Sequence, residues 1–119
     1  MAQERKFSGG CHCGRVRYEV TTGLEPVLDC NCSICQKRGA LWTYVEPAQF
    51  KLLSGEGDLA DYQFNTRNIH HFFCRTCGVG SFSRGHGADG SEGIGINVRC
   101  LEGIDLAALK LTPYDGRSR

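Results

Sequence analysis

Apolar and polar residues alternate along several short stretches of the chain, which is the pattern of half-buried β-strands. Residues 15–20 place Val16, Tyr18 and Val20 on one face and polar side chains on the other. Residues 42–45 are rich in β-branched and aromatic side chains, which also favours a strand. The pattern predicts many short strands and almost no helix, so the predicted fold class is mainly β.

Other segments near the centre of the chain lead into or follow turns. Residues 27–29 are expected to be extended and to deliver Cys30, and residues 33–38 are predicted to form one helical turn or a knuckle that ends at Gly39. Residues 50–53 and 61–64 flank a turn-rich segment, which predicts either a hairpin or two edge strands.

The second half of the chain continues the same style of short elements. Residues 69–73 and 94–98 are predicted strands, and residues 105–109 form a capped helical turn. Residues 85–93 form a glycine-rich loop that holds His86 and Asp89, and its composition favours mobility.

The spacing of the cysteines adds candidate metal ligands to this outline. Cys30, Cys32 and Cys35 lie within six residues, where a Cys-x-Cys pair is too cramped for an easy disulfide and Cys-x-x-Cys is the usual spacing for zinc. Cys11 and Cys13 sit in a glycine-flanked turn, and a second Cys-x-x-Cys-Gly knuckle contains Cys74 and Cys77. Spacing alone does not decide whether the first pair joins the knuckle or the central trio.

Composition describes a single domain over residues 1–119, with 40% hydrophobic and 23% charged residues. Without its eight cysteines the apolar share falls to roughly a third, so a bound metal would help to stabilise a small core. The charged N-terminus has no apolar run behind it, which predicts no signal peptide, no membrane segment and a cytoplasmic location. In a reducing compartment, clustered cysteines are more often metal ligands or catalytic groups than disulfides.

Charge argues against one class of partner. The formal net charge is +1; seven thiolates would lower it by seven and two Zn²⁺ ions would raise it by four, which leaves −2. The sequence shows no basic stripe interleaved with aromatic residues, so nucleic-acid binding is not expected.

The cysteine motifs, in their order and separation, resemble the glutathione-dependent formaldehyde-activating enzyme family, whose members include S-(hydroxymethyl)glutathione synthase and centromere protein V. The resemblance rests on four segments: Gly10-Cys11-His12-Cys13-Gly14, Cys30-Asn31-Cys32-Ser33-Ile34-Cys35, Phe73-Cys74-Arg75-Thr76-Cys77-Gly78 and Ile96-Asn97-Val98-Arg99-Cys100-Leu101. It implies a zinc-stabilised β-tent of small antiparallel sheets with one or two short helical turns.

The resemblance also implies two zinc ions per chain. A structural zinc would be closed by Cys11, Cys13, Cys74 and Cys77. A second, catalytic and potentially labile zinc would be held by Cys30, Cys32 and Cys35. Completion of this second site by Cys100 or a histidine is the alternative, in which both metals are structural.

Other polar residues have both functional and ordinary interpretations. His70 and His71 are adjacent on a predicted strand and point to opposite faces, so at most one approaches a metal. His12 is expected to point outward, and His86 is a candidate lid residue. Cations near the trio would stabilise its negative charge or meet substrate carboxylates, although each is more often plain surface; the candidates are Lys37, Arg38, Arg67, Arg75, Arg84 and Arg99.

Zinc bound by three thiolates suits chemistry at sulfur. The leading hypothesis is a zinc-dependent carbon–sulfur lyase or synthase that acts on the adduct of a small thiol with a small carbonyl, for which glutathione and formaldehyde are the family's named case. The alternative is a non-catalytic, zinc-stabilised protein-interaction module.

Overall fold

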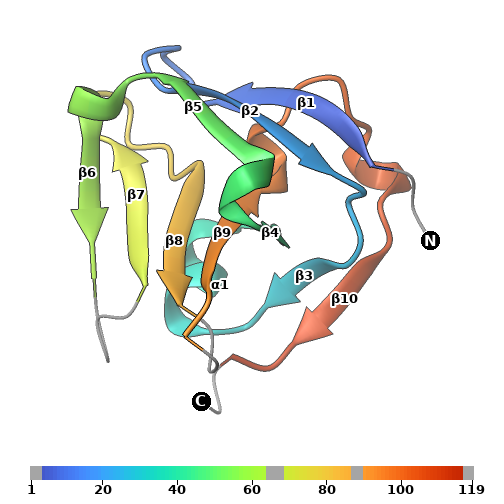
Figure 1. Cartoon of the computed structure of the whole chain (residues 1–119). Helices are drawn as coiled ribbons and strands as arrows, with labels where there is room; N and C mark the ends of the chain where they lie inside the picture. The colour runs from blue at the N-terminus through green and yellow to red at the C-terminus, as the bar shows by residue number, and fades with distance from the viewer. Residues whose placement is uncertain (1–3, 64–68, 87–89, 117–119) are drawn as a thin grey trace.

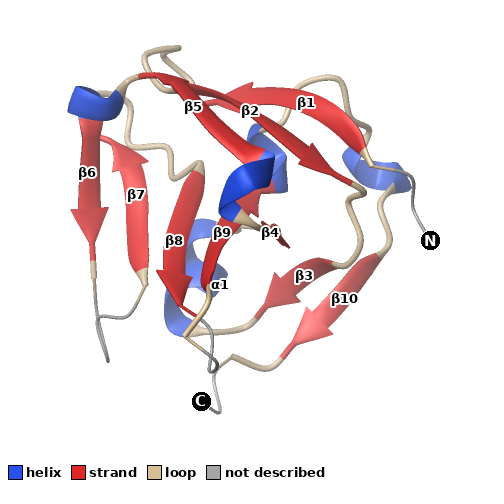
Figure 2. Ribbon diagram, in the orientation of Figure 1, coloured by secondary structure: helices blue, strands red, loops and turns tan. Residues whose placement is uncertain are grey.

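The computed structural model describes residues 4–63, 69–86 and 90–116. Within these ranges the chain forms ten strands in two sheets, and helix is confined to short segments (Figures 1 and 2). The predicted mainly β fold is therefore confirmed. No helix among the described residues is long and apolar enough to cross a membrane.

The smaller sheet has three strands in the order β1-β2-β5, and it lies across the top of the view in Figure 1. Its strands are antiparallel: β1 (Arg5–Gly10), β2 (Arg17–Thr22) and β5 (Phe50–Ser54). The alternation that predicted β2 is confirmed, because Val16, Tyr18 and Val20 are all buried.

The larger sheet has seven strands in the order β10-β3-β4-β9-β8-β7-β6. Neighbours are antiparallel except β10, which pairs with β3 in parallel and so departs from the expected purely antiparallel sheets. The strands are β3 (Val27–Cys30), β4 (Trp42–Val45), β6 (Leu59–Tyr62), β7 (His70–Cys74), β8 (Phe82–His86), β9 (Glu92–Asn97) and β10 (Leu111–Tyr114).

The helical segments are short, as predicted. The single α-helix among the described residues is α1 (Ser33–Arg38), which ends at Gly39 in the left-handed conformation that glycine adopts readily. Asp105 caps one of four 3₁₀ turns by accepting a hydrogen bond from the Ala107 amide at 3.1 Å. These turns are η1 (Pro47–Gln49), η2 (Glu56–Asp58), η3 (Val98–Cys100) and η4 (Leu106–Ala108).

Aromatic packing joins the two sheets. The ring of Phe50 in the smaller sheet lies 5.1 Å from that of Tyr18 and 4.8 Å from that of Phe82 in the larger sheet. Tyr18, Ile94 and Ile96 are fully buried in the same core. The interior between the sheets is therefore filled, and open space lies elsewhere in the molecule.

Of the two alternatives for residues 50–53 and 61–64, the pair of edge strands is confirmed and the hairpin is not. β5 and β6 are edge strands of different sheets, and Phe64 lies outside the described residues. The prediction of a loop over residues 85–93 needs correction. Both ends of this segment belong to strands, because Gly85 of β8 pairs with Gly93 of β9 and His86 pairs with Glu92. Asp89 lies outside the described residues. Strands β1 and β10 were not predicted.

Candidate metal centres

Four cysteines from the two sheets meet at one point. Cys11 and Cys13 follow β1, and Cys74 ends β7, with Cys77 in the next turn. Their Sγ atoms lie within 4.8 Å of one another, and the Sγ of Cys13 is 3.6 Å from those of both Cys11 and Cys74. Four sulfurs around zinc at ~2.3 Å would stand about 3.8 Å apart, so this cluster fits a zinc ion closed by four thiolates.

Backbone amides favour thiolates in this cluster. The amides of Val16 and Thr76 each donate a 3.4 Å hydrogen bond, to the Sγ atoms of Cys11 and Cys74 respectively. Burial raises the pKa of Cys77, but backbone hydrogen bonds from Cys13 and Val79 outweigh it and lower the pKa to about 6. The pKa of Cys11 is nevertheless raised, because burial outweighs its hydrogen bond from Val16, so a metal at this cluster would have to displace that proton.

The second cluster forms where β3 passes into α1. Cys30 ends the strand, Cys32 precedes the helix and Cys35 lies within it, and their Sγ atoms also lie within 4.8 Å of one another. The Cys32 amide donates to the Sγ of Cys30 at 3.4 Å, and the indole Nε1–H of Trp42 donates to the Sγ of Cys35 at 3.1 Å. These three sulfurs could hold one metal with a coordination position left over.

The thiols of this trio differ in acidity. Burial raises the pKa of Cys35 well above its ordinary value and the Cys32 thiol raises it further, while the hydrogen bond from Trp42 opposes the rise. Burial also acts on Cys32, but hydrogen bonds from Cys35 outweigh it and lower its pKa. Metal binding would have to displace the Cys35 proton, and Trp42 assists that displacement.

The C-terminal part of the described chain lies against the trio. Tyr114 of β10 pairs with Cys30 of β3, and the Tyr114 carbonyl accepts a 3.1 Å hydrogen bond from the Asn31 amide. A Cβ at Gly116 would stand 2.6 Å from the Sγ of Cys30 and 3.0 Å from the Cβ of Cys32. Only glycine fits there without displacing the cysteines.

A cavity of about 510 Å³ opens above the trio. All three cysteines line it. Apolar walls come from Leu28, Ile34, Trp42, Tyr44, Ile69 and Tyr114, and the other lining residues are His71, Ser83, Gly85, His86, Ser91, Gly93, Gly95 and Gly116. A small molecule could therefore reach the sulfurs.

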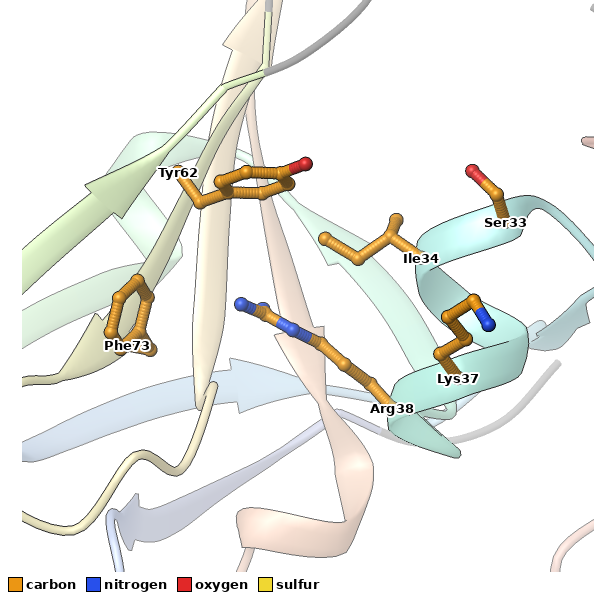
Figure 3. Close-up of a pocket in the computed structure, with 6 residues that line it drawn as sticks. All are labelled: Ser33, Ile34, Lys37, Arg38, Tyr62 and Phe73. Atoms are coloured by element: carbon orange, nitrogen blue, oxygen red, sulfur yellow. The ribbon is translucent and has the colours of Figure 1, made fainter.

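A separate groove of about 490 Å³ lies between α1 and the β6–β7 pair. Arg38 extends from α1 toward Tyr62 and Phe73, and its Cζ lies 5.7 Å from the centre of the Phe73 ring (Figure 3). Lys37 also lines this groove. The cations expected beside the trio thus line the adjacent groove, and Ile34 is the residue that both hollows share.

His70 and His71 have different surroundings, as predicted for adjacent residues of a strand. His71 is buried and lines the cavity, whereas the Nδ1 of His70 lies 2.6 Å from a carboxylate oxygen of Asp61. Burial and the charge of Arg38 lower the pKa of His71. His86 lines the cavity, and His12 is exposed as predicted.

Cys100 does not complete the trio. Its pKa rises to about 11 because it is buried near Cys11 and Cys77, and its Sγ lies 3.9 Å from the Gly80 carbonyl oxygen. Among the described residues, the candidate ligands at the second centre are the three cysteines alone.

The remaining cations named from the sequence make contacts elsewhere or lie in solvent. Arg75 donates to the Leu59 carbonyl at 3.2 Å, Arg84 pairs with Glu92 at 3.1 Å, and Arg99 is exposed. Arg67 lies outside the described residues.

Trp42 and Gly116 were missed as parts of the site. No spacing motif links them to the cysteines, although the tryptophan, the only one in the chain, was placed on the strand that carries it.

Comparisons with known proteins agree with this arrangement. The crystal structure of a Rhodobacter sphaeroides protein is similar, with a TM-score of 0.78 and 36% sequence identity over 89% of this chain and 97% of that chain. The family model for the glutathione-dependent formaldehyde-activating enzyme matches residues 6–112. With nearly the whole chain matched and both cysteine clusters assembled, the chain belongs to the glutathione-dependent formaldehyde-activating enzyme family.

Proposed function

We propose that this chain is a zinc-dependent enzyme that makes or breaks the carbon–sulfur bond of an adduct between a small thiol and a small carbonyl compound. The observation that carries the proposal is the difference between the two clusters. The four-cysteine cluster supplies a full tetrahedral set, whereas the trio supplies three sulfurs at the floor of a cavity of about 510 Å³. Glutathione and formaldehyde are the pair that the family name suggests.

Cys30, Cys32 and Cys35 would hold the catalytic ion. When bound, zinc would lower the pKa of an added thiol and so maintain a nucleophilic thiolate. In the bond-forming direction, the substrate sulfur attacks the carbonyl carbon, the carbon–sulfur bond forms and the π electrons move to the carbonyl oxygen. That oxygen takes up the proton that the thiol released, so no oxidant or reductant is needed.

His71 is positioned to carry that proton. It lines the same cavity as the trio, and burial together with Arg38 lowers its pKa, so the imidazole is neutral at pH 7 and can accept a proton. The reverse sequence would release the carbonyl compound and the thiol.

Cobalt replacement tests the open position. In the full chain loaded with Co²⁺ in place of zinc, addition of a small thiol should change the ligand-field and thiolate charge-transfer bands, because sulfur enters the second site. Cys100→Ser should leave that response unchanged. Two sites already saturated with protein ligands and no response to thiols would instead favour the protein-interaction module.

A further inference from the structure

The cavity above the trio has a shape that follows from the register of the larger sheet. Four residues in one cross-strand row line it: Tyr44 on β4 pairs with Gly95 on β9, Gly95 with Ser83 on β8, and Ser83 with His71 on β7. Large side chains stand at the ends of the row and small ones in the middle. Tyr44 and Ser83 close the space over Gly95, where an added Cβ would stand 3.0 Å from the Tyr44 ring and 2.5 Å from the Ser83 Oγ, so this row borders the hollow on one side.

A second row deepens the hollow. Gly85 pairs with Gly93, two residues along each strand from Ser83 and Gly95, and residues two apart share a face of a sheet. A Cβ at Gly93 would meet no described atom within 4 Å. Among the residues that the structure describes, none fills the space beside Gly93.

The rim of the cavity is apolar and exposed. Tyr44 and Ile69 are 59% and 45% exposed, and they belong to the small set of large apolar side chains that the described chain leaves in solvent. Exposed apolar residues gathered around a hollow mark ligand or partner sites. Here they border a cavity that ends on three thiols.

Charge is missing where an ionic ligand would need it. Among the described lining residues none is Asp, Glu, Lys or Arg, and the nearby cations Lys37 and Arg38 line the separate groove. Three thiolates with a divalent ion would carry a net charge of −1, which disfavours carboxylates beside the metal. A cavity of about 510 Å³ is also far larger than a one-carbon carbonyl requires.

We propose that the cavity selects adducts that carry an uncharged apolar group, aromatic or branched aliphatic, next to the reacting carbon–sulfur bond. The inference rests on the proposed function, because it assigns the substrate's sulfur to the trio. The apolar group lies in the hollow over Gly93. It can come from the thiol or from the aldehyde, since both meet at the same bond.

Direct thiol binding to the Co²⁺-loaded full chain tests the selection. Phenylmethanethiol, 2-mercaptoethanol and glutathione are titrated, and each dissociation constant is read from the charge-transfer band. Phenylmethanethiol should bind about 10–100-fold more tightly than 2-mercaptoethanol, as expected for burial of one aromatic side chain. Glutathione should bind no more tightly than 2-mercaptoethanol, because its carboxylates find no cation in the cavity.

Gly93→Val fills the hollow at a position where an added Cβ meets no described atom within 4 Å, and it should abolish the preference for phenylmethanethiol over 2-mercaptoethanol. Gly93→Ala, a smaller change, should reduce the preference in part and guards against misfolding of the valine variant. Gly57→Val is the matched control: a Cβ there also meets nothing within 4 Å, and Gly57 does not line the cavity. It should keep the full preference.

A second arm locates the apolar group. With 2-mercaptoethanol as the thiol, adduct formation with formaldehyde and with phenylacetaldehyde is compared in wild type and Gly93→Val. Loss of phenylacetaldehyde turnover alone assigns the hollow to the aldehyde half, and an unchanged rate assigns it to the thiol half.

The outcomes separate this inference from the proposed function. If thiols bind with no gain from apolar size and Gly93→Val also leaves phenylacetaldehyde turnover unchanged, or if glutathione binds most tightly and Gly93→Val has no effect, the inference is wrong and the function stands. If no thiol alters the spectrum of the wild-type protein, both are wrong.

Discussion

Trp42 packs against the candidate catalytic centre in a small buried cluster with Cys35 and Ala40. It is 3% exposed, lies on β4, and donates its indole N–H to the Sγ of Cys35. A partner of this kind fixes the orientation of a ligand and stabilises its charged form. The same residue therefore closes one wall of the cavity and influences how readily Cys35 loses its proton.

Trp42→Phe should weaken metal binding at the trio by about 10–100-fold, the usual loss for a partner outside the ligand shell. The pKa of Cys35 is already raised by burial, and removal of the indole N–H raises it further. Protons then compete better with metal, so metal release during acid titration should begin at a higher pH than in wild type. Competition with a chelator at several pH values measures both effects.

The four-cysteine cluster is the internal control for this variant, because Trp42 makes no hydrogen bond to it among the described contacts. Its affinity and pH of release should match wild type. Equal loss at both centres, or no change in the pH of release, would show that the indole acts through packing alone.

Sequence spacing was sufficient to find the cysteines but not their surroundings. Cys-x-Cys and Cys-x-x-Cys reflect local geometry that a single zinc ion imposes, so the motif is visible along the chain. The indole that meets Cys35 comes from the next strand, and its role depends on how that strand packs. The hollow over Gly93 similarly depends on cross-strand register, which the sequence does not display.

At the scale of elements, the pairing of β3 with β10 supports the trio. The parallel register places Tyr114 beside Cys30 and leads the chain to Gly116, whose backbone lies against Cys30 and Cys32. β10 was not predicted because Leu111–Tyr114 contains a proline, has mostly exposed side chains and shows no clear alternation. The confirmed strands β2 and β4 carry stronger apolar or aromatic patterns.

Gly116→Ala should lower metal affinity at the trio on the order of tenfold, similar to the loss of an outer partner of a ligand. The added methyl group would occupy a position 2.6 Å from the Sγ of Cys30, so either the segment or the cysteine must move. Metal content after graded exposure to a chelator, measured for each centre, reports the change.

Gly57→Ala is the matched control for Gly116→Ala, since an added Cβ at Gly57 meets no atom within 4 Å. Its metal affinity at the trio should match that of wild type. Wild-type affinity in Gly116→Ala would mean that β10 can shift without cost and does not position the trio.

At the scale of the whole molecule, the two centres connect different parts of the fold. The four-cysteine cluster joins the turn after β1, in the smaller sheet, to the end of β7 in the larger sheet. The trio lies within one continuous segment from β3 to α1. A metal at the first centre would hold two sheets together, whereas a metal at the second would order only a local turn.

This difference predicts opposite consequences for serine substitutions. Cys74 is fully buried, and Cys74→Ser should prevent soluble folding, because structural zinc contributes on the order of 10–16 kcal/mol in finger peptides while a whole domain is stable by only about 5–15 kcal/mol. Cys11→Ser, Cys13→Ser and Cys77→Ser should act in the same way.

A triple serine variant at Cys30, Cys32 and Cys35 should instead lose one metal per chain and its thiol response, yet keep the fold. Metal content per chain and thermal unfolding of the soluble fraction measure the contrast. A Cys74→Ser protein that melts as wild type does would remove the structural role from the first centre, and global unfolding of the triple variant would give that role to the second.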